Sequence, residues 1–300
     1  MNRVVLWRVS ASLLLIALML TGILLGIAWR RGHSRRPVRG LTVTYFDVGA
    51  GDCALVRSPE GQAILIDTGG AETGEALAAA IKARGVSRVD LLILTSPDPG
   101  SLGGVPALLD SGIDVSRIWD NAVPEVSDAR RAALEAIRRH RPRIPSQTAS
   151  GGDVIQIGER MSVSTVWPPD IGAAARRDPL ICRVNYGSTA FVFEGTASTV
   201  AETALISQAA PRIECTAACT DLVLQTAADA TGPPSAEMLR RATPTVAVLT
   251  GRTQGGLPPT LLRRLRAAGA ALWRTETQGA ITVTTDGRGT LAVRAEPASK

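Results

Sequence analysis

The chain of 300 residues is long enough for one large domain or two small ones, and its 45% apolar and 20% charged residues exclude a protein built mostly of membrane spans. Its net charge of +6 would suggest a nucleic-acid-binding surface, but the charge is unevenly placed. Residues 1–40 hold seven arginines and no acid, which leaves 26 basic against 27 acidic residues in 41–300, so bulk charge does not support a phosphate-binding body.

The first predicted element is a membrane-spanning helix. Residues 9–29 (VSASLLLIALMLTGILLGIAW) are uncharged and long enough to cross a hydrocarbon core of about 30 Å. Trp7 and Trp29 bracket this run, and the IAWRRGH that ends it is a poor signal-peptide cleavage site. We therefore expect residues 1–29 to be an uncleaved membrane anchor with its span at about 9–29, followed by a basic juxtamembrane linker at 30–40 that could contact anionic headgroups.

The side of the membrane on which the body lies stays open. Five arginines follow the run and two precede it, which favours a cytoplasmic body, whereas a signal-anchor commonly exports the domain attached to its C-terminal end. Cys215 and Cys219 could form a disulfide in an oxidising compartment or be two buried small residues. A four-cysteine zinc site that adds Cys53 and Cys182 lacks the usual paired spacing. The sequence does not indicate the oligomeric state.

Residues 41–296 are predicted to form one mixed α/β domain made of two similar halves, each a sheet with helices on its outer face. Apolar and β-branched runs predict strands at 41–46, 54–58, 62–67, 90–94, 153–157, 161–166, 180–185, 189–194 and 221–225. Apolar periodicity predicts helices at 72–85, 104–110, 130–140 and 198–208. Two helix–strand pairs follow in 233–249 and 258–275, then a closing hairpin at 279–293 with Asp286-Gly287 in its turn.

The predicted helix at 130–140 (RRAALEAIRRH) is rich in arginine. On a period of 3.6 residues the arginines fall on the exposed face, which favours a solvated surface over a nucleic-acid patch.

Three segments together resemble a known family. YFDVGAGDCALVRSPEGQAILIDTGG (45–70), DLLILTSPDPGSLGGVPALL (90–109) and WRTETQGAITVTTDG (273–287) are similar to the metallo-β-lactamase-fold domain at the C-terminal end of the competence protein ComEC. That family has patterns such as L-D-V-G-Q-G-D, T-H-P-D-x-D-H-x-G-G and T-D-x-x-G-x-I in the same order. The resemblance implies a four-layer αβ/βα sandwich over nearly all of 41–296, here preceded by one N-terminal transmembrane helix.

The resemblance also implies a two-metal hydrolase site, in which histidines and carboxylates hold zinc or manganese ions that activate water. Carried over position by position, most of these ligands are absent. In the loop after strand 90–94, the two histidines fall on Ser96 and Ser101, the first aspartate is kept as Asp98, and the second falls on Gly100. In the second half, the ligand positions fall on Thr196, Ala227, Ala228 and Leu257.

The histidine count agrees with this loss independently of the family. The chain has two histidines, His33 in the linker and His140 at the end of a helix, and neither lies near a strand-end loop. Zinc needs three or four N, S or carboxylate ligands at about 2.0–2.3 Å, which alanine and leucine cannot supply. We therefore expect no dinuclear hydrolase site, no catalytic or metal-binding residues and no cofactor.

Other motif residues are retained: Asp47, Gly49, Gly51, Asp52, Asp67, Gly69, Gly70, Gly103 and Gly104. The favoured interpretation is that the aspartates brace turns and the glycines let the chain turn tightly. The competing interpretation is a carboxylate site for Mg²⁺ or Mn²⁺ that includes Asp98, since hard cations accept oxygen-only ligands. Ser96 and Ser101 lack a nearby base and are interpreted as polar filler rather than nucleophiles.

Two functions are indicated as hypotheses. The first is a membrane-anchored, ComEC-like pseudoenzyme that binds or scaffolds an unknown protein partner, with a link to DNA uptake or the cell envelope, and with nucleic acid as a partner by family analogy alone. The alternative is a divergent phosphodiesterase or nuclease that uses Asp98, neighbouring carboxylates and weakly held Mg²⁺ or Mn²⁺.

Overall fold

The computed structural model describes residues 40–121, 127–140, 144–168, 179–207, 219–228, 234–253 and 256–297, together with Met19. The predicted membrane span at 9–29 and the linker at 30–40 lie almost entirely outside these residues. Within the described part of the chain, no helix is both long and apolar enough to cross a bilayer. The described residues from 40 to 297 belong to one compact unit.

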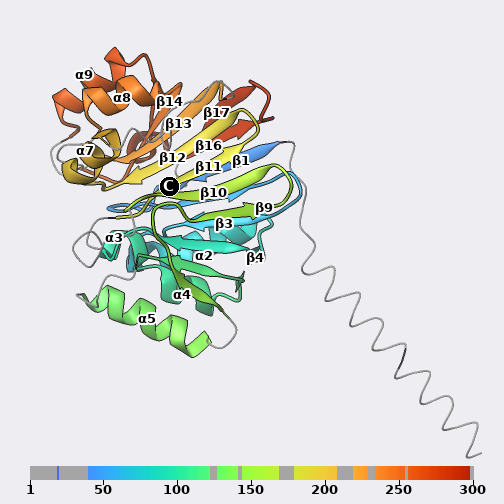
Figure 1. Ribbon diagram of the computed structural model, residues 1–300. Coiled ribbons are helices and arrows are strands. Elements are labelled where there is room, and N and C mark those ends of the chain that lie inside the picture. The colour runs from blue at the N-terminus through green and yellow to red at the C-terminus, as the bar shows by residue number, and fades with distance from the viewer. Residues whose placement is uncertain are drawn as a thin grey trace, which may run out of the picture. The chain divides into compact units, whose positions relative to one another are not determined.

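Two sheets form the centre of this unit (Figure 1). The first sheet has the strand order β17 (Leu291–Glu296), β16 (Ala280–Thr285), β1 (Leu41–Tyr45), β2 (Ala54–Arg57), β3 (Ala63–Ile66), β5 (Leu91–Leu94), β7 (Ile118–Asp120) and β8 (Ser146–Thr148). The second sheet has the order β15 (Ala271–Arg274), β14 (Val246–Thr250), β13 (Asp221–Ala227), β12 (Thr189–Gly195), β11 (Ile181–Tyr186), β10 (Met161–Trp167) and β9 (Val154–Ile157). A small parallel pair joins β4 (Arg88–Val89) and β6 (Asp114–Val115).

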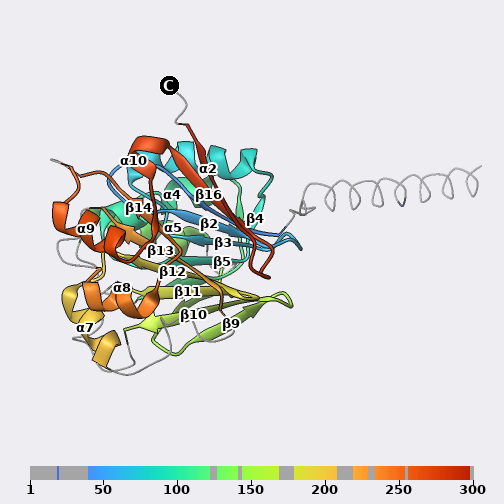
Figure 2. The ribbon, with the colours of Figure 1, turned by 90° about the horizontal axis from the view of Figure 1, so that it is seen from above.

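Helices cover the outer face of each sheet, so the unit has four layers (Figures 1 and 2). The first sheet is covered by α2 (Gly74–Ala83), α3 (Pro99–Leu102), α4 (Val105–Asp110) and α5 (Asp128–His140), and the short helix η1 (Ala71–Thr73) leads into α2. The second is covered by α7 (Thr199–Ser207), α8 (Ala236–Ala242) and α9 (Pro259–Ala267), while the short helix α10 (Thr275–Gln278) connects β15 to β16. The predicted strand–helix order is confirmed, while α3, α10 and the short strands β4, β6, β7 and β8 were not predicted.

Strand β5 shows why the sequence forms this arrangement. Leu91 and Ile93 pack into the core between the two sheets, and Leu92 and Leu94 pack against the helices outside. Side chains alternate across a strand, so a central strand covered on both faces must be apolar at every position. This explains the uninterrupted LLIL run that delivers the chain to the loop at residues 95–104.

The parallel parts of the two sheets position the site. Strands β3, β5 and β7 are parallel, as are β12, β13 and β14. Their carboxyl ends therefore present loops at one edge of each sheet, which is where ligands bind in open α/β sheets.

The prediction for the arginine-rich helix was partly wrong. Arg130 in α5 is only 2% exposed and forms two hydrogen bonds with the Asp120 carboxylate at the end of β7, at 3.0 and 2.7 Å. A paired and buried arginine does not contribute to a solvated face. This contact fixes α5 against the sheet, a role that helical periodicity alone does not distinguish from exposure.

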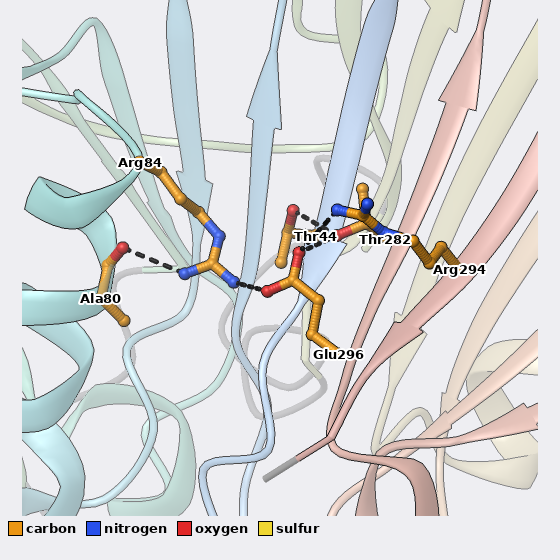
Figure 3. Close-up of polar contacts among 6 residues, drawn as sticks. All are labelled: Thr44, Ala80, Arg84, Thr282, Arg294 and Glu296. Atoms are coloured by element: carbon orange, nitrogen blue, oxygen red, sulfur yellow. Dashed lines mark hydrogen bonds and ion pairs between the residues drawn. The ribbon is translucent and has the colours of Figure 1, made fainter. Parts of the chain in front are cut away.

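A cluster of polar side chains links β17, an edge strand of the first sheet, to α2 (Figure 3). Arg84, at the end of α2, donates to the Ala80 carbonyl at 3.1 Å and pairs with Glu296 of β17. Thr282 donates to the same carboxylate at 3.4 Å and contacts Thr44 at 3.0 Å. These contacts link β1, β16 and β17, which lie at one edge of the first sheet, to helix α2.

Candidate functional site

A cleft of about 270 Å³ lies where the strand-end loops meet. It is lined by the loop before β2, the loop after β5, the last residue of β13, and the residues that follow β12 and β14. Among the sequence-predicted positions, the cleft brings together Gly51, Asp52, Asp98, Gly100, Ser101, Thr196 and Ala227. The sequence positions assigned from the family motifs thus converge in space, although they come from both halves of the chain.

Two positions of the second half do not line the cleft. Ala228 is 2% exposed and packs in the core between the second sheet and its helices. Leu257 is half-buried and packs against the same core. Where the family has imidazoles, these side chains therefore contribute apolar contacts to the helical layer.

The loop after β5 is held together by its own polar groups. The Ser96 hydroxyl donates to Asp98 Oδ2 at 2.6 Å, and the Asp98 backbone N–H donates back to Ser96 Oγ at 3.2 Å. The Ser101 N–H then donates to the Asp98 carbonyl at 2.9 Å, where the short helix α3 begins. Asp98 itself is exposed at the rim of the cleft. Ser96 therefore orients Asp98, which is more specific than the filler role expected for it.

The Asp52 carboxylate, 7% exposed, forms the floor of the cleft. Its Oδ1 accepts hydrogen bonds from Gln225 Nε2 at 3.2 Å and from the Thr250 hydroxyl. Gln225 also accepts from the Gly195 N–H at 3.2 Å, so its orientation is fixed. Sequence analysis missed Gln225 and Thr250, although polar side chains after the apolar runs LVL of β13 and VAVL of β14 were a usable signal.

Asp47 and Asp67 are engaged by protein groups as well. Asp47 accepts from the Gly49 N–H at 3.3 Å and pairs with Arg252 at 3.1 Å. Asp67 accepts from the N–H and the hydroxyl of Thr95 at 2.8 and 2.6 Å, and joins the loops that follow β3 and β5. Burial raises the pKa of Asp67 well above its usual range and the charges of other carboxylates add to this, while the Thr95 hydrogen bonds oppose it.

At Gly100, where the family has an aspartate ligand, close backbone contact leaves no room for a side chain. A Cβ atom at Gly100 would lie 2.5 Å from the Ala50 carbonyl oxygen, and a Cβ atom at Gly51 would lie 2.0 Å from the Gly100 carbonyl oxygen. An aspartate at Gly100 would require one of these two loops to move. The other retained glycines, Gly49, Gly69, Gly70, Gly103 and Gly104, shape the same loops.

The side chains of the cleft do not provide the ligands that two metal ions would need. The described residues contain no group of three or more His, Cys, Asp or Glu side chains placed to hold an ion. Asp47, Asp52 and Asp67 already bind protein donors, and Ala227 brings no donor to the cleft. Since a dinuclear site needs several convergent ligands for each ion, these residues leave only Asp98 as an exposed carboxylate in the cleft.

The layered fold with a cleft at the strand ends defines the class of protein. Residues 46–169 match the family model described as metallo-beta-lactamase superfamily, which covers less than half of the chain. Residues 46–169 are therefore similar to the metallo-β-lactamase superfamily, and the mixed α/β sandwich of the described residues is consistent with that fold.

Solved structures extend the likeness in fold beyond that segment. CmlA, a diiron β-hydroxylase from Streptomyces venezuelae, is 14% identical with a TM-score of 0.55, and the alignment covers 83% of this chain and 55% of the CmlA chain. The metallo-β-lactamase fold protein YhfI from Bacillus subtilis is 11% identical with a TM-score of 0.51, covering 78% of this chain and 96% of YhfI. No curated protein sequence matches the chain. At these identities the structures support the fold alone.

Proposed function

We propose that this protein is a non-catalytic metallo-β-lactamase-fold protein that uses its strand-end cleft to bind a partner or ligand. One observation carries the proposal. Asp52 and Asp67 are hydrogen-bonded to protein donors, which leaves Asp98 as the exposed carboxylate among the described residues of the cleft. Backbone contact between Ala50 and Gly100 fills a position where the family would place a metal ligand. A cleft without a metal pair cannot generate hydroxide at neutral pH in the way these hydrolases do.

The resemblance to ComEC in the sequence motifs supports a role beside a DNA-uptake or envelope system. The uncharged run at 9–29 supports attachment to a membrane as a single-pass protein. Cys219 is disulfide-bonded, whereas Cys53 and Cys182 are free and buried. Disulfides persist in oxidising compartments, so this favours a body on the outer side of the membrane. Cys215 lies outside the described residues.

The alternative function, a hydrolase that uses Asp98 with Mg²⁺ or Mn²⁺, has less support. It needs further carboxylates next to Asp98, but Asp47 pairs with Arg252, and Asp67 is held by Thr95. The near-neutral charge of residues 41–300 also gives no support for binding of nucleic acid by the body alone.

The test is a phosphodiesterase assay of the full chain with added Zn²⁺, Mn²⁺ or Mg²⁺, alongside the Asp98→Ala variant and Glu159→Ala as a control. Glu159 is an exposed carboxylate in the turn between β9 and β10, at the other end of the sheet. We expect no activity that depends on Asp98. Turnover that is lost in Asp98→Ala but kept in Glu159→Ala would establish the hydrolase instead.

A further inference from the structure

The charge of the cleft is the starting observation. Among the described residues that line it, Asp52 and Asp98 are acidic and none is basic. Arg252 follows the lining residue Gly251, but its guanidinium pairs with Asp47 at 3.1 Å, so this rim pair adds no net charge. A metal pair would make such a cleft attractive to anions. Without one, the two carboxylates make it attractive to cations.

Ser101 supplies a second, independent observation. It lines the cleft with only 4% of its surface exposed. Its N–H and carbonyl are used in the backbone, but its hydroxyl makes no hydrogen bond within the part of the chain that the structure describes. The hydroxyl can therefore donate to, or accept from, a ligand that enters the cleft.

Asp98 limits the kind of cation that fits. Its Oδ2 already accepts the Ser96 hydroxyl at 2.6 Å, so the carboxylate is oriented and one of its oxygens is occupied. A guanidinium binds best when both carboxylate oxygens are available to its two parallel N–H groups. An ammonium group is a compact charge with three donors and does not need both oxygens.

We propose that the cleft binds a primary alkylammonium group, which donates to Asp98 and to the Ser101 hydroxyl. The alkyl chain lies against Pro99 and Ala227, which give the cleft its apolar wall. A volume of about 270 Å³ admits a small diamine or the end of a lysine side chain. The proposal rests on the proposed function, since a bound metal pair would change the charge of the cleft from negative to positive.

The experiment is calorimetric titration of the full chain with putrescine, with Nα-acetyl-lysine methylamide, and with the diol that has the carbon skeleton of putrescine. We expect an amine to bind, the diol not to bind, and affinity to fall as ionic strength rises. Binding of the lysine amide would indicate a polypeptide ligand, and binding of putrescine alone would indicate a free amine. Inorganic phosphate serves as the anionic probe and is expected not to bind.

The variants assign the effect to the cleft. Asp98→Asn is expected to weaken amine binding roughly tenfold or more and Ser101→Ala a few-fold, while Glu159→Gln leaves it unchanged. Thermal unfolding of each variant shows whether it is folded. Binding that survives in folded Asp98→Asn, equal binding of the diol, or a preference for phosphate would overturn the proposal.

The same titration with Zn²⁺ and Mn²⁺ separates the two proposals. Stoichiometric metal uptake would overturn the proposed function and this inference with it. If neither metal nor amine binds, the inference fails and the proposed non-catalytic function stands.

Discussion

The loops of the first and second halves line the same cleft but differ in what they have kept. The loops before β2 and after β3 keep their aspartates and glycines. The loop after β5 keeps Asp98, Gly103 and Gly104 but has Ser96, Gly100 and Ser101 at ligand positions. At the ends of β12 and β13, the ligand positions hold Thr196, Ala227 and Ala228. The retained residues are those with structural contacts: Asp67 joins two loops through Thr95, and Gly51 lies against the Gly100 backbone. Among the substituted positions of the second half, Ala228 packs in the core and Thr196 is exposed at the cleft. Retention of a motif in this fold therefore reflects loop geometry as much as chemistry.

The largest expected effect of a loop substitution at neutral pH comes from Gly51. In Gly51→Ala the new Cβ would lie 2.0 Å from the Gly100 carbonyl oxygen, so we expect a loss of about 3 kcal/mol in the free energy of unfolding. Gly49→Ala is the control, because φ is +74° there but no atom lies within 4 Å, and about 1 kcal/mol is expected. Denaturant unfolding measures both. Equal losses in the two variants would show that backbone conformation rather than loop contact explains the retained glycines.

Substitutions at Asp67 test whether its carboxyl group holds two loops together or binds an ion. Asp67→Ala removes the acceptor for two Thr95 donors and is expected to cost about 2 kcal/mol. Burial raises the pKa of Asp67 well above its usual range, so a neutral Asp67→Asn side chain is expected to be tolerated within about 1 kcal/mol. The measurement is again denaturant unfolding at neutral pH. A loss in Asp67→Asn as large as in Asp67→Ala would show that the ionised carboxylate is required.

A buried carboxyl near the end of β12 makes stability depend on pH. Glu194, at the end of β12, is 0% exposed, and neither of its side-chain oxygens has a hydrogen-bond partner in the described residues. Burial, then the neighbouring Glu202, raises the pKa of Glu194 from 4.5 to about 8. The folded state thus binds this proton more tightly than the unfolded chain. The resulting stability is complete below pH 4.5 and is lost as pH rises through about 8.

Glu194→Gln is expected to remove this dependence, which amounts to at most about 1.4 kcal/mol per pH unit between the two pKa values. Urea unfolding of the wild type and the variant from acid to alkaline pH measures it. Parallel stability curves for the two proteins would show that Glu194 does not carry the effect.

The smallest effect is expected at a substituted ligand position. Thr196 is exposed at the cleft, so Thr196→Ala should change the unfolding free energy by no more than about 0.5 kcal/mol. A much larger loss would mean that the second half carries structural contacts that its sequence does not reveal.

The fold followed from the sequence where patterns were strong. The LLIL run of β5 and the periodic α2 were predicted because burial on one or two faces leaves a local pattern. Short strands such as β7 were missed, since three residues carry too little pattern. Buried Arg130 was misplaced because its partner Asp120 precedes the helix and pairs with it only in the fold.

The site could be predicted only in part. Family motifs brought Asp52, Asp98 and Ala227 to one cleft, but hydrogen bonds between distant residues, such as Gln225 with Asp52, leave no local signal. The lack of room for a side chain at Gly100, next to the Ala50 carbonyl, likewise depends on how two loops pack.

The central claim is that the strand-end cleft cannot hold a metal pair. The most direct test is equilibrium dialysis of the full chain against Zn²⁺ and Mn²⁺, followed by elemental analysis of the protein and of the Asp98→Asn variant. The account predicts far less than one bound ion per chain, with no difference between the two proteins. Stoichiometric metal in the wild type that is lost in Asp98→Asn would contradict it.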